Sequence, residues 1–331
     1  MLKKAIVLIL FLTTFTILSN KNKQSIYKFL ETIGYKDVTP EWIKTMDFLS
    51  MMSFSHTVLP DSINSLKNLK TIRINYTPIK KLPATLVELQ GLEKIYLYDT
   101  AISEIPNWIG QLKNLRNLEV AHARLTAVPE SIGNLQELRG LFVHTNQIRE
   151  LPYSLANLQK LEKFWFMENR ITRLPQSLVR LKKLRYLYAS NNQIISLPKQ
   201  FGNLKDLEWL RLSSNQIERL PNSMRKLKKL RFLYIDNNNL VKLPEWIGEL
   251  ENLEELYIGE NYLTELPKSF GKLTKLRELR ITGNHFLFLP EVIFSMTHIE
   301  KLYLDETFIP QAGELADKLR STKKYYYDYR H

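Results

Sequence analysis

Residues 174–196, LPQSLVRLKKLRYLYASNNQIIS, contain a spacing of apolar residues that recurs along the chain every 23 residues. A Leu-Pro pair or a close equivalent opens each unit, and no insertion interrupts the series. A fixed period of this length predicts a solenoid, in which each unit packs on its neighbours and the outer surface carries the function. The opening residues are Leu59, Leu82, Ile105, Val128, Leu151, Leu174, Leu197, Leu220, Leu243, Leu266 and Leu289.

Seven apolar positions in each unit are too many for a single unit to bury. Stacked units would join them into one continuous core, so several repeats are needed before any is stable. Phe164 and Phe166 fall in two of these columns, and the small Ala189 follows Phe166 in the next unit. This alternation predicts volume compensation in a close-packed interior.

The pattern L-x-x-L-x-L-x-x-N-x-[IL]-x-x-L-P-x-x-[IL]-x-x-L resembles the leucine-rich repeat family in its 23-residue form, over eleven units and residues 59–310. The resemblance implies an α/β fold, a right-handed horseshoe solenoid with a concave parallel sheet and a helical or irregular convex side. The period-two alternation at 71–75 agrees with a strand. The resemblance also implies a buried asparagine that satisfies backbone groups of the turn, here Asn146, Asn169, Asn192, Asn215, Asn238, Asn261 and Asn284. In the outer units Thr77, Thr100, Ala123 and Thr307 replace it.

An open stack exposes apolar ends, so we expect a cap at each end of the repeats. Residues 24–58 form the first cap, where Ser25 and Thr39-Pro40 predict helix starts. Ile43, Met46, Leu49 and Met51 fall one period before apolar residues of the first unit, so this cap includes a degenerate first repeat. Residues 311–331 are expected to form a cap helix followed by a basic, aromatic tail.

The pattern of residues 1–19 indicates a targeting segment rather than a part of the fold. Lys3 and Lys4 precede the apolar stretch 5–18, which is short for a bilayer span and fits a cleaved secretory signal. An uncleaved membrane anchor is the alternative. The chain has no cysteine, so no disulfide staples its caps. These features favour a bacterial protein that is secreted, periplasmic or on the cell surface. Without export, intracellular signalling scaffolds such as the plant Ras-group repeat proteins become the better comparison.

The net charge of +13 raises the question of nucleic-acid binding. Residues 1–30 contribute five lysines and no acid, and residues 311–331 five basic against three acidic groups, so about half of the excess is terminal. We therefore interpret the internal clusters as a solvated face and do not expect nucleic acid as the partner. Contact with acidic polysaccharide, lipid head groups or nucleic acid is the alternative. The clusters are Arg180, Lys182, Lys183 and Arg185, then Arg225, Lys226, Lys228, Lys229 and Arg231.

Catalytic and metal-binding patterns are missing from the sequence. Six histidines are scattered, and only His122 and His144 come from adjacent units on the expected concave side. A metal site needs three or four ligands, and neither cysteine nor a carboxylate cluster completes one. We find no glycine-rich phosphate loop, nucleophile motif or HExxH. The sequence therefore predicts a protein without enzymatic activity, cofactor or metal.

Aromatic residues concentrate at the position between the two leucines of each strand, which faces the concave side. This column reads Arg73, Tyr96, Glu119, Phe142, Trp165, Tyr188, Arg211, Tyr234, Tyr257, Arg280 and Tyr303, and seven of these eleven residues are aromatic. The position two residues earlier adds further rings in three consecutive units. Exposed Trp, Tyr and Arg have the composition of binding hot spots. The predicted partner-binding residues are Phe142, Trp165, Tyr186, Tyr188, Trp209, Arg211, Phe232, Tyr234 and Tyr257.

Sheet packing offers a second interpretation of the same column. Aromatic pairs on neighbouring strands stabilise a sheet by ~0.2–1 kcal/mol each without any ligand. A large exposed apolar patch, however, is a liability unless something covers it. We therefore expect a monomer that binds a protein partner across the concave face of units four to eight. Binding of a carbohydrate or cell-envelope glycan is the alternative, because sugars also stack on aromatic rings.

Overall fold

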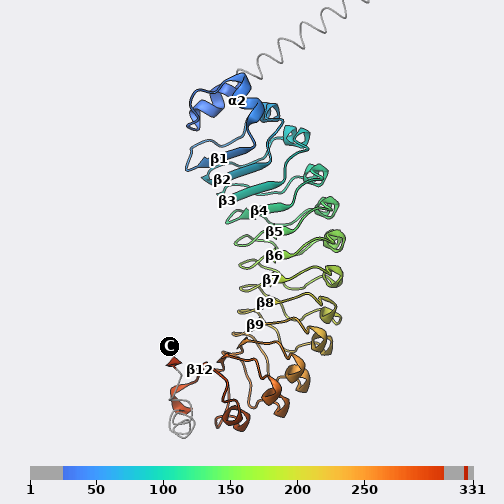
Figure 1. Cartoon of the computed structure of the whole chain (residues 1–331), viewed down its shortest axis with the longest axis vertical. Helices are drawn as coiled ribbons and strands as arrows, with labels where there is room; N and C mark the ends of the chain where they lie inside the picture. Colours follow the sequence, from blue (N-terminus) through green and yellow to red (C-terminus); the bar gives the residue numbers. More distant parts are fainter. Residues whose placement is uncertain (1–24, 309–323, 327–331) are drawn as a thin grey trace, which may run out of the picture.

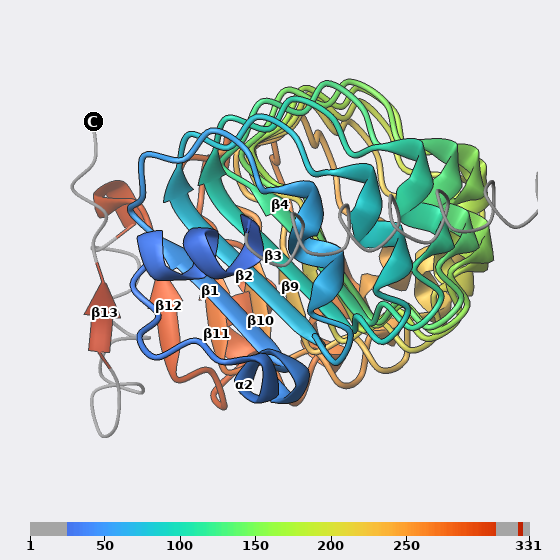
Figure 2. The ribbon, with the colours of Figure 1, turned by 90° about the horizontal axis from the view of Figure 1, so that it is seen from above.

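The computed structural model describes residues 25–308 and 324–326, which form one curved stack of repeats (Figure 1). The expected signal at 1–19 and the expected cap helix after residue 311 lie outside the described residues. Seen from above, the strands gather on one side of the stack and the short helices on the other (Figure 2). The molecule therefore has the open, two-sided form that the repeat predicts.

On the concave side, the described residues form a parallel sheet of thirteen strands, ordered as they occur in the chain. Each pair is in register at an offset of 23 residues, so that Leu210 lies opposite Leu233. Because the sequence has no insertion between units, every strand meets the same register. The strands are β1 Phe48–Met52, β2 Thr71–Thr77, β3 Lys94–Thr100, β4 Asn117–Ala121, β5 Gly140–Phe142, β6 Lys163–Trp165, β7 Tyr186–Tyr188, β8 Trp209–Arg211, β9 Phe232–Tyr234, β10 Glu255–Tyr257, β11 Glu278–Arg280, β12 Lys301–Tyr303 and β13 Lys324–Tyr326.

The convex side consists of short 3₁₀ helices, most of them starting directly after the proline of a unit. In η3, the N–H of Ile109 bonds to the Pro106 carbonyl at 2.9 Å and the N–H of Leu112 to the Ile109 carbonyl at 3.1 Å. A spacing of three between buried residues matches three residues per turn, so the convex face is 3₁₀ rather than α-helical. The helices are η1 Asp61–Ser65, η2 Ala84–Glu88, η3 Asn107–Gln111, η4 Glu130–Asn134, η5 Tyr153–Asn157, η6 Gln176–Arg180, η7 Phe201–Asn203, η8 Asn222–Lys226, η9 Glu245–Glu249, η10 Lys268–Lys272, η11 Glu291–Ser295 and η12 Glu306–Phe308.

The N-terminal end of the stack carries two α-helical segments and the first strand. Residues 25–32 are helical, and α2 spans Pro40–Thr45, with the Thr39 side chain accepting a hydrogen bond from Trp42 N–H at 3.1 Å. Strand β1 pairs with β2, placing Leu49 opposite Ile72. This strand continues the register of the repeats into the cap.

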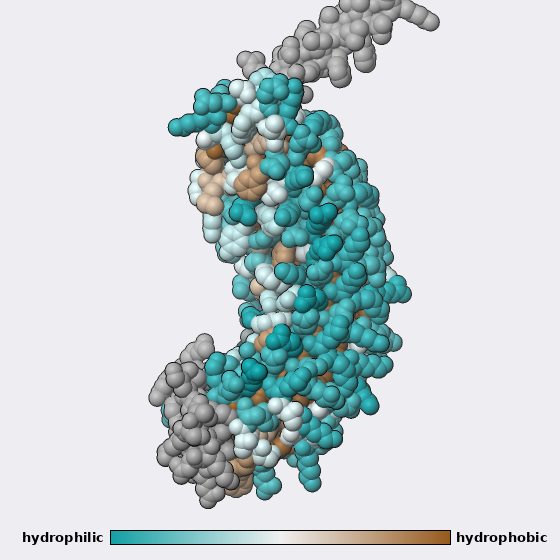
Figure 3. Space-filling model, viewed as in Figure 1, coloured by the Kyte–Doolittle hydropathy of each residue, from teal (hydrophilic) through white to brown (hydrophobic). Residues whose placement is uncertain are grey.

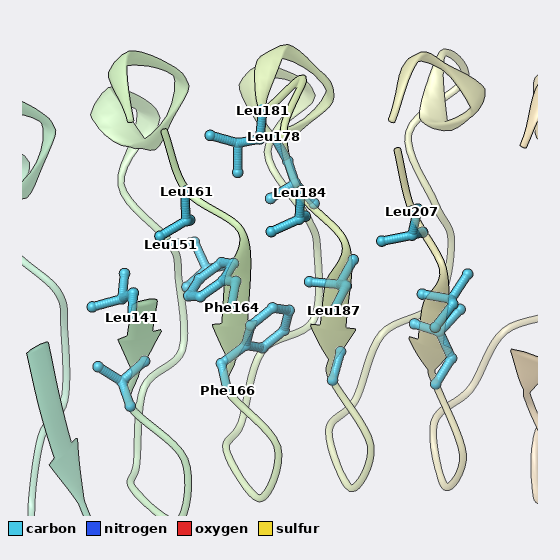
Figure 4. Packing of buried hydrophobic residues seen from close by; sticks show 14 of the residues in the cluster. Leu141, Leu151, Leu161, Phe164, Phe166, Leu178, Leu181, Leu184, Leu187 and Leu207 are labelled. Atoms are coloured by element: carbon cyan, nitrogen blue, oxygen red, sulfur yellow. The ribbon is translucent and has the colours of Figure 1, made fainter. Parts of the chain in front are cut away.

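The core runs without a break along the whole stack. Phe164 and Phe166 are fully buried, with ring centroids 4.6 Å apart (Figure 4). Ala189, in the next unit, is also fully buried. The small side chain leaves room for the Phe166 ring, as the sequence predicts. Trp246, on the convex side, is also buried against this core.

The asparagine column ties each turn to its two neighbours. Asn215 donates from Nδ2 to the carbonyls of Ala189, Leu212 and Ser213 at 3.0, 2.9 and 3.4 Å. Its Oδ1 accepts from Ile194 N–H at 3.0 Å. One buried side chain thus satisfies four backbone groups in adjacent units, the role that the family resemblance implies.

The three N-terminal units without this asparagine have a different strand end. Strands β2 and β3 continue for seven residues, and Thr77 pairs with Thr100, whereas β5 to β11, whose units have the asparagine, have three residues each. Strand β4 has five residues, and β12, in the unit of Thr307, has three. The Oγ1 atoms of Thr77 and Thr100 are buried and have no hydrogen-bond partner among the described residues. The shorter threonine cannot reach the backbone groups that asparagine binds, so the turn after the strand is built differently here.

Candidate functional site

The side chains between the paired leucines form a continuous line across the sheet, here called the concave row: Arg73, Tyr96, Glu119, Phe142, Trp165, Tyr188, Arg211, Tyr234, Tyr257, Arg280 and Tyr303. Strand register places each member directly opposite the next, as for Trp165 and Tyr188. In the view of Figure 3 the convex side is mostly hydrophilic, and paler residues line the hollowed concave side. The row follows this hollow.

The predicted binding residues divide into two groups by burial. Phe142, Phe232 and Tyr234 are each only 8% exposed, so the expectation that Phe142 and Phe232 belong to an exposed apolar patch is wrong. The reason is mutual covering, since neighbouring strands lie ~4.8 Å apart and ring faces at that spacing shield one another. All three lie outside the main core cluster. The residues that keep access to solvent are Trp165, Tyr186, Tyr188, Trp209, Arg211 and Tyr257.

The rings of the central strands pack in two short stacks. Trp165 lies nearly parallel to Tyr188, with centroids 5.1 Å apart and an interplanar angle of 10°, and it meets Phe142 edge-on at 4.8 Å. Trp209 stacks on Phe232 at 3.7 Å. These contacts are sheet-stabilising pairs, as the second interpretation of the column expects. They also hold the half-buried faces of Trp165 and Trp209 in fixed orientations.

Arg211 is the exposed charge at the centre of the row. Its guanidinium lies 4.9 Å from the ring centroids of both Tyr188 and Tyr234 and 5.7 Å from Trp209. No carboxylate forms an ion pair with it within the described part of the chain. A guanidinium held between aromatic faces keeps its N–H edges available for an incoming acceptor.

Towards the C-terminal end, tyrosines and carboxylates form a closed network. Tyr234 donates to Glu255 at 2.5 Å and Tyr257 donates to Glu278, which also accepts from Lys301 at 2.7 Å. Burial, followed by the hydrogen bond to the carboxylate, raises the pKa of Tyr234 well above its usual value, and the pKa of Tyr257 rises for the same reasons. These hydroxyls therefore stay protonated, and the hydrogen bond to Glu278 fixes the position of the Tyr257 side chain.

His122 and His144 both lie near the ring of Tyr98, at centroid distances of 5.7 and 6.5 Å. His122 Nδ1 is 3.2 Å from Asp99 Oδ1. Burial lowers the pKa of His144. Among residues 25–308, no three His, Asp or Glu side chains group closely enough to hold a metal ion. The pair therefore has the geometry of a packed aromatic contact.

Several cations of the basic clusters predicted as a solvated face are paired with carboxylates of the same chain. Arg185 forms two hydrogen bonds to Glu208, both at 2.9 Å, and Arg231 forms two to Glu254 at 2.8 and 2.9 Å. Lys229 bonds to Asp206 at 2.7 Å. These contacts join charges 23 residues apart, in adjacent units, and reduce the free positive charge open to a polyanion.

The sequence interpretation missed one exposed apolar pair. Leu287 is 85% exposed and Phe288 73% exposed, on the turn between β11 and η11. They border a groove of about 990 Å³ that includes Leu266 and Pro290. The equivalent residues one unit earlier are Thr264 and Glu265, so comparing unit columns at these two positions finds the pair.

No helix in the described residues is both long enough and apolar enough to cross a membrane.

Among known protein families, a model described as a leucine-rich repeat region matches residues 43–141, 92–178, 175–258 and 224–323. No curated protein matches the chain.

Solved structures share the fold at low identity. A leucine-rich repeat protein of Leptospira interrogans is 24% identical over 88% of this chain and 99% of its own, with a TM-score of 0.50. The ectodomain of the Arabidopsis thaliana receptor kinase GASSHO1/SCHENGEN3, solved with CASPARIAN STRIP INTEGRITY FACTOR 2, is 21% identical over 87% of this chain and 43% of its own, at 0.56. TLR13, solved with an RNA, is 23% identical over 82% of this chain and 42% of its own, at 0.68. One fold thus carries ligands of different classes, and the ligand class has to be inferred from the surface.

Proposed function

Because the chain belongs to the leucine-rich repeat family, whose members are typically binding modules, we propose that it is a non-enzymatic protein that binds a protein partner through the concave row of units four to eight. The structural neighbour solved with CASPARIAN STRIP INTEGRITY FACTOR 2 is a precedent for such a ligand. We propose that the protein acts outside the cytoplasm, in line with the signal-like residues 1–19.

The observation that carries this proposal is the setting of Arg211. An exposed guanidinium, fixed by cation–π contacts and without an ion-pair partner in the described chain, is prepared for a carboxylate that another molecule supplies. Tyr188 on the neighbouring strand and Trp209 two residues earlier on the same strand offer half-exposed rings beside it, and Trp165 lies one strand beyond Tyr188. A central cation with aromatic neighbours has the composition of an interface hot spot.

The buried rings serve this surface indirectly. Phe232 supports Trp209, and Phe142 supports Trp165, through the ring contacts described above. Replacing Phe142 or Phe232 is therefore expected to lower stability as well as binding, so neither variant can test the interface. Trp165, Tyr188 and Arg211 are better choices.

The test is a comparison of affinity columns made from the whole protein and its variants, loaded with extract from the native host. Trp165→Ala and Arg211→Ala are expected to lose the captured partner, with a binding loss of about 2 kcal/mol or more each. Lys183→Ala, an exposed cation outside the row, is the matched control and should retain it. Thermal melting of each variant separates lost binding from lost folding, since Arg211→Ala should cost less than about 1 kcal/mol of stability.

The result that would contradict the proposal is capture of the same protein by all variants at equal affinity. Capture that is abolished by short oligosaccharides, instead, would favour glycan binding on the same face. We favour that alternative less, because Trp165 already stacks on Tyr188 and Trp209 on Phe232.

A further inference from the structure

Another hollow lies at the C-terminal ends of strands β2, β3 and β4, where the chain leaves the sheet. It measures about 580 Å³ and is lined by residues 76–78, 99–101 and 122–124 together with Thr145. These segments come from the three consecutive units in which Thr77, Thr100 and Ala123 replace the asparagine. The hollow therefore coincides with the break in the asparagine column.

The floor of the hollow is made by small or short side chains. Pro78, Ala101 and Ala123 supply apolar surface, and the buried Thr77 and Thr100 lie with them. In the units that follow, the asparagine draws the turn inward by bonding to strand carbonyls, as Asn146 does to Val120 at 2.8 Å. Without those bonds the strands run on, and the turn leaves an open space at the edge.

The rim of the hollow is polar and close to neutral. Asp99 and His122 pair with each other at 3.2 Å, and their side chains remain 46% and 51% exposed. Arg124 is exposed and forms no ion pair with the described residues, so it offsets the charge of Asp99. A rim that carries one carboxylate and one guanidinium does not select for a charged ligand.

One aromatic ring completes the site. Tyr76 is 52% exposed and lines the hollow, and its ring is held edge-on by Tyr98 at 5.6 Å. An open, flat ring beside paired hydrogen-bonding groups suits a ligand that has an apolar face and several hydroxyl groups. Ligand sites commonly combine apolar lining with a few polar groups that fix orientation.

We propose that this hollow binds a neutral pyranose sugar, whose apolar face packs on Tyr76 and whose hydroxyl groups bind Asp99 and Arg124. The free oxygen of the Asp99 carboxylate accepts from hydroxyl groups, and the Arg124 guanidinium donates to their oxygens. The site is separate from the concave row, so the proposal does not depend on a protein partner there. Because the site offers one aromatic ring and two charged side chains to the sugar, we expect a dissociation constant of about 1 mM.

The experiment measures binding to the full chain by saturation-transfer NMR and titration calorimetry. The ligands are the methyl glycosides of glucose, galactose, mannose and N-acetylglucosamine. At least one should bind the natural protein. Asp99→Ala should weaken it by fivefold or more, and Ala101→Leu, which fills the floor, should abolish it. The matched control is Glu260→Ala, which changes the residue equivalent to Asp99 in a unit that has the asparagine and should bind as before.

Three outcomes would overturn the proposal. The first is no binding of any of the four glycosides at about ten times the expected dissociation constant. The second is binding that persists unchanged in both Asp99→Ala and Asp99→Asn with the fold intact by circular dichroism. The third is tighter binding of glucuronic acid or glucosamine than of every neutral sugar, which would contradict the neutral rim. Comparing a pentasaccharide with the methyl glycoside of its terminal sugar shows whether the ligand is a single sugar or a glycan chain. Equal affinities indicate that one sugar ring is bound, and a much higher affinity of the pentasaccharide indicates a glycan chain.

Discussion

Replacing Asn215 by leucine should weaken the solenoid by an amount that follows from its hydrogen bonds. The side chain is 8% exposed and makes four bonds to backbone groups. Three of those groups keep another partner in the variant: the Ala189 carbonyl keeps Asn192, the Leu212 carbonyl keeps Asn238, and the Ser213 carbonyl keeps the N–H of Asn191. The fourth, Ile194 N–H, has no other acceptor among the described residues.

The expected cost is therefore dominated by one orphaned donor. A buried N–H without a partner costs about 1–3 kcal/mol, and three carbonyls that lose one of two bonds add a smaller amount. We expect about 3 kcal/mol in all. With an m-value of about 3 kcal/mol/M in urea, the unfolding midpoint should fall by roughly 1 M. Hydrogen exchange should show the amide of Ile194 exchanging faster than that of Ile217, which retains the Asn238 oxygen at 2.9 Å.

Two variants control this reasoning. Asn215→Asp keeps an oxygen for Ile194 N–H but loses the three donated bonds, so it should protect that amide even where the fold is weakened. Thr77→Asn places an asparagine where Thr77 Oγ1 has no partner, and it should leave stability unchanged or raise it slightly. An unaltered urea midpoint for Asn215→Leu, with Ile194 still protected from exchange, would refute the assigned role of the asparagine column.

Three further predictions concern other parts of the chain. Burial raises the pKa of Glu278, but hydrogen bonds from Lys301 and Tyr257 outweigh this effect and hold the pKa below its usual value. The ionised Glu278 therefore stabilises the fold fully above the unfolded-state pKa of about 4.3. This stabilisation is lost as the pH falls through the lower pKa of the folded state. Glu278→Gln should therefore flatten the acid side of the stability profile, and a urea midpoint that still falls as steeply below about pH 5 would count against it. Leu287→Ser with Phe288→Ser should leave the melting temperature unchanged, because both side chains are exposed; a large drop would show that they are covered in solution. If residues 1–19 are a signal, protein from the native host should begin near Asn20 outside the cytoplasm, and N-terminal sequencing that returns Met1 from the cytosolic fraction would exclude this.

The repeat itself was predictable because one-dimensional stacking leaves few choices. A 23-residue period without insertions places Leu210 opposite Leu233 and Asn215 next to Asn238, whatever the surrounding side chains are. The core columns and the strand register follow from that spacing, and the family resemblance implied the asparagine contacts. The direction in which Trp165 and Arg211 face is equally determined, since alternate residues of a strand point to opposite sides.

Access to solvent among the aromatic side chains on the concave side depended on the tertiary structure. Whether Phe232 is exposed depends on how the ring of Trp209 lies over it at 3.7 Å, and side-chain orientation across strands is not encoded in the period. The pairing of Arg231 with Glu254 was present in the sequence as opposite charges one unit apart, but the two hydrogen bonds at 2.8 and 2.9 Å require the real geometry of adjacent turns.

The hollow beside Thr100 has one feature that the sequence predicts and another that only the tertiary structure determines. The replacement of asparagine by Thr77, Thr100 and Ala123 was visible in the sequence. The consequence, strands of seven residues and a space of about 580 Å³ rimmed by Asp99 and Arg124, was not. Apolar periodicity specifies what is buried, because burial is favourable for any chain with that pattern. The shape left at an edge depends on which backbone groups find partners, and only the folded chain brings those groups together.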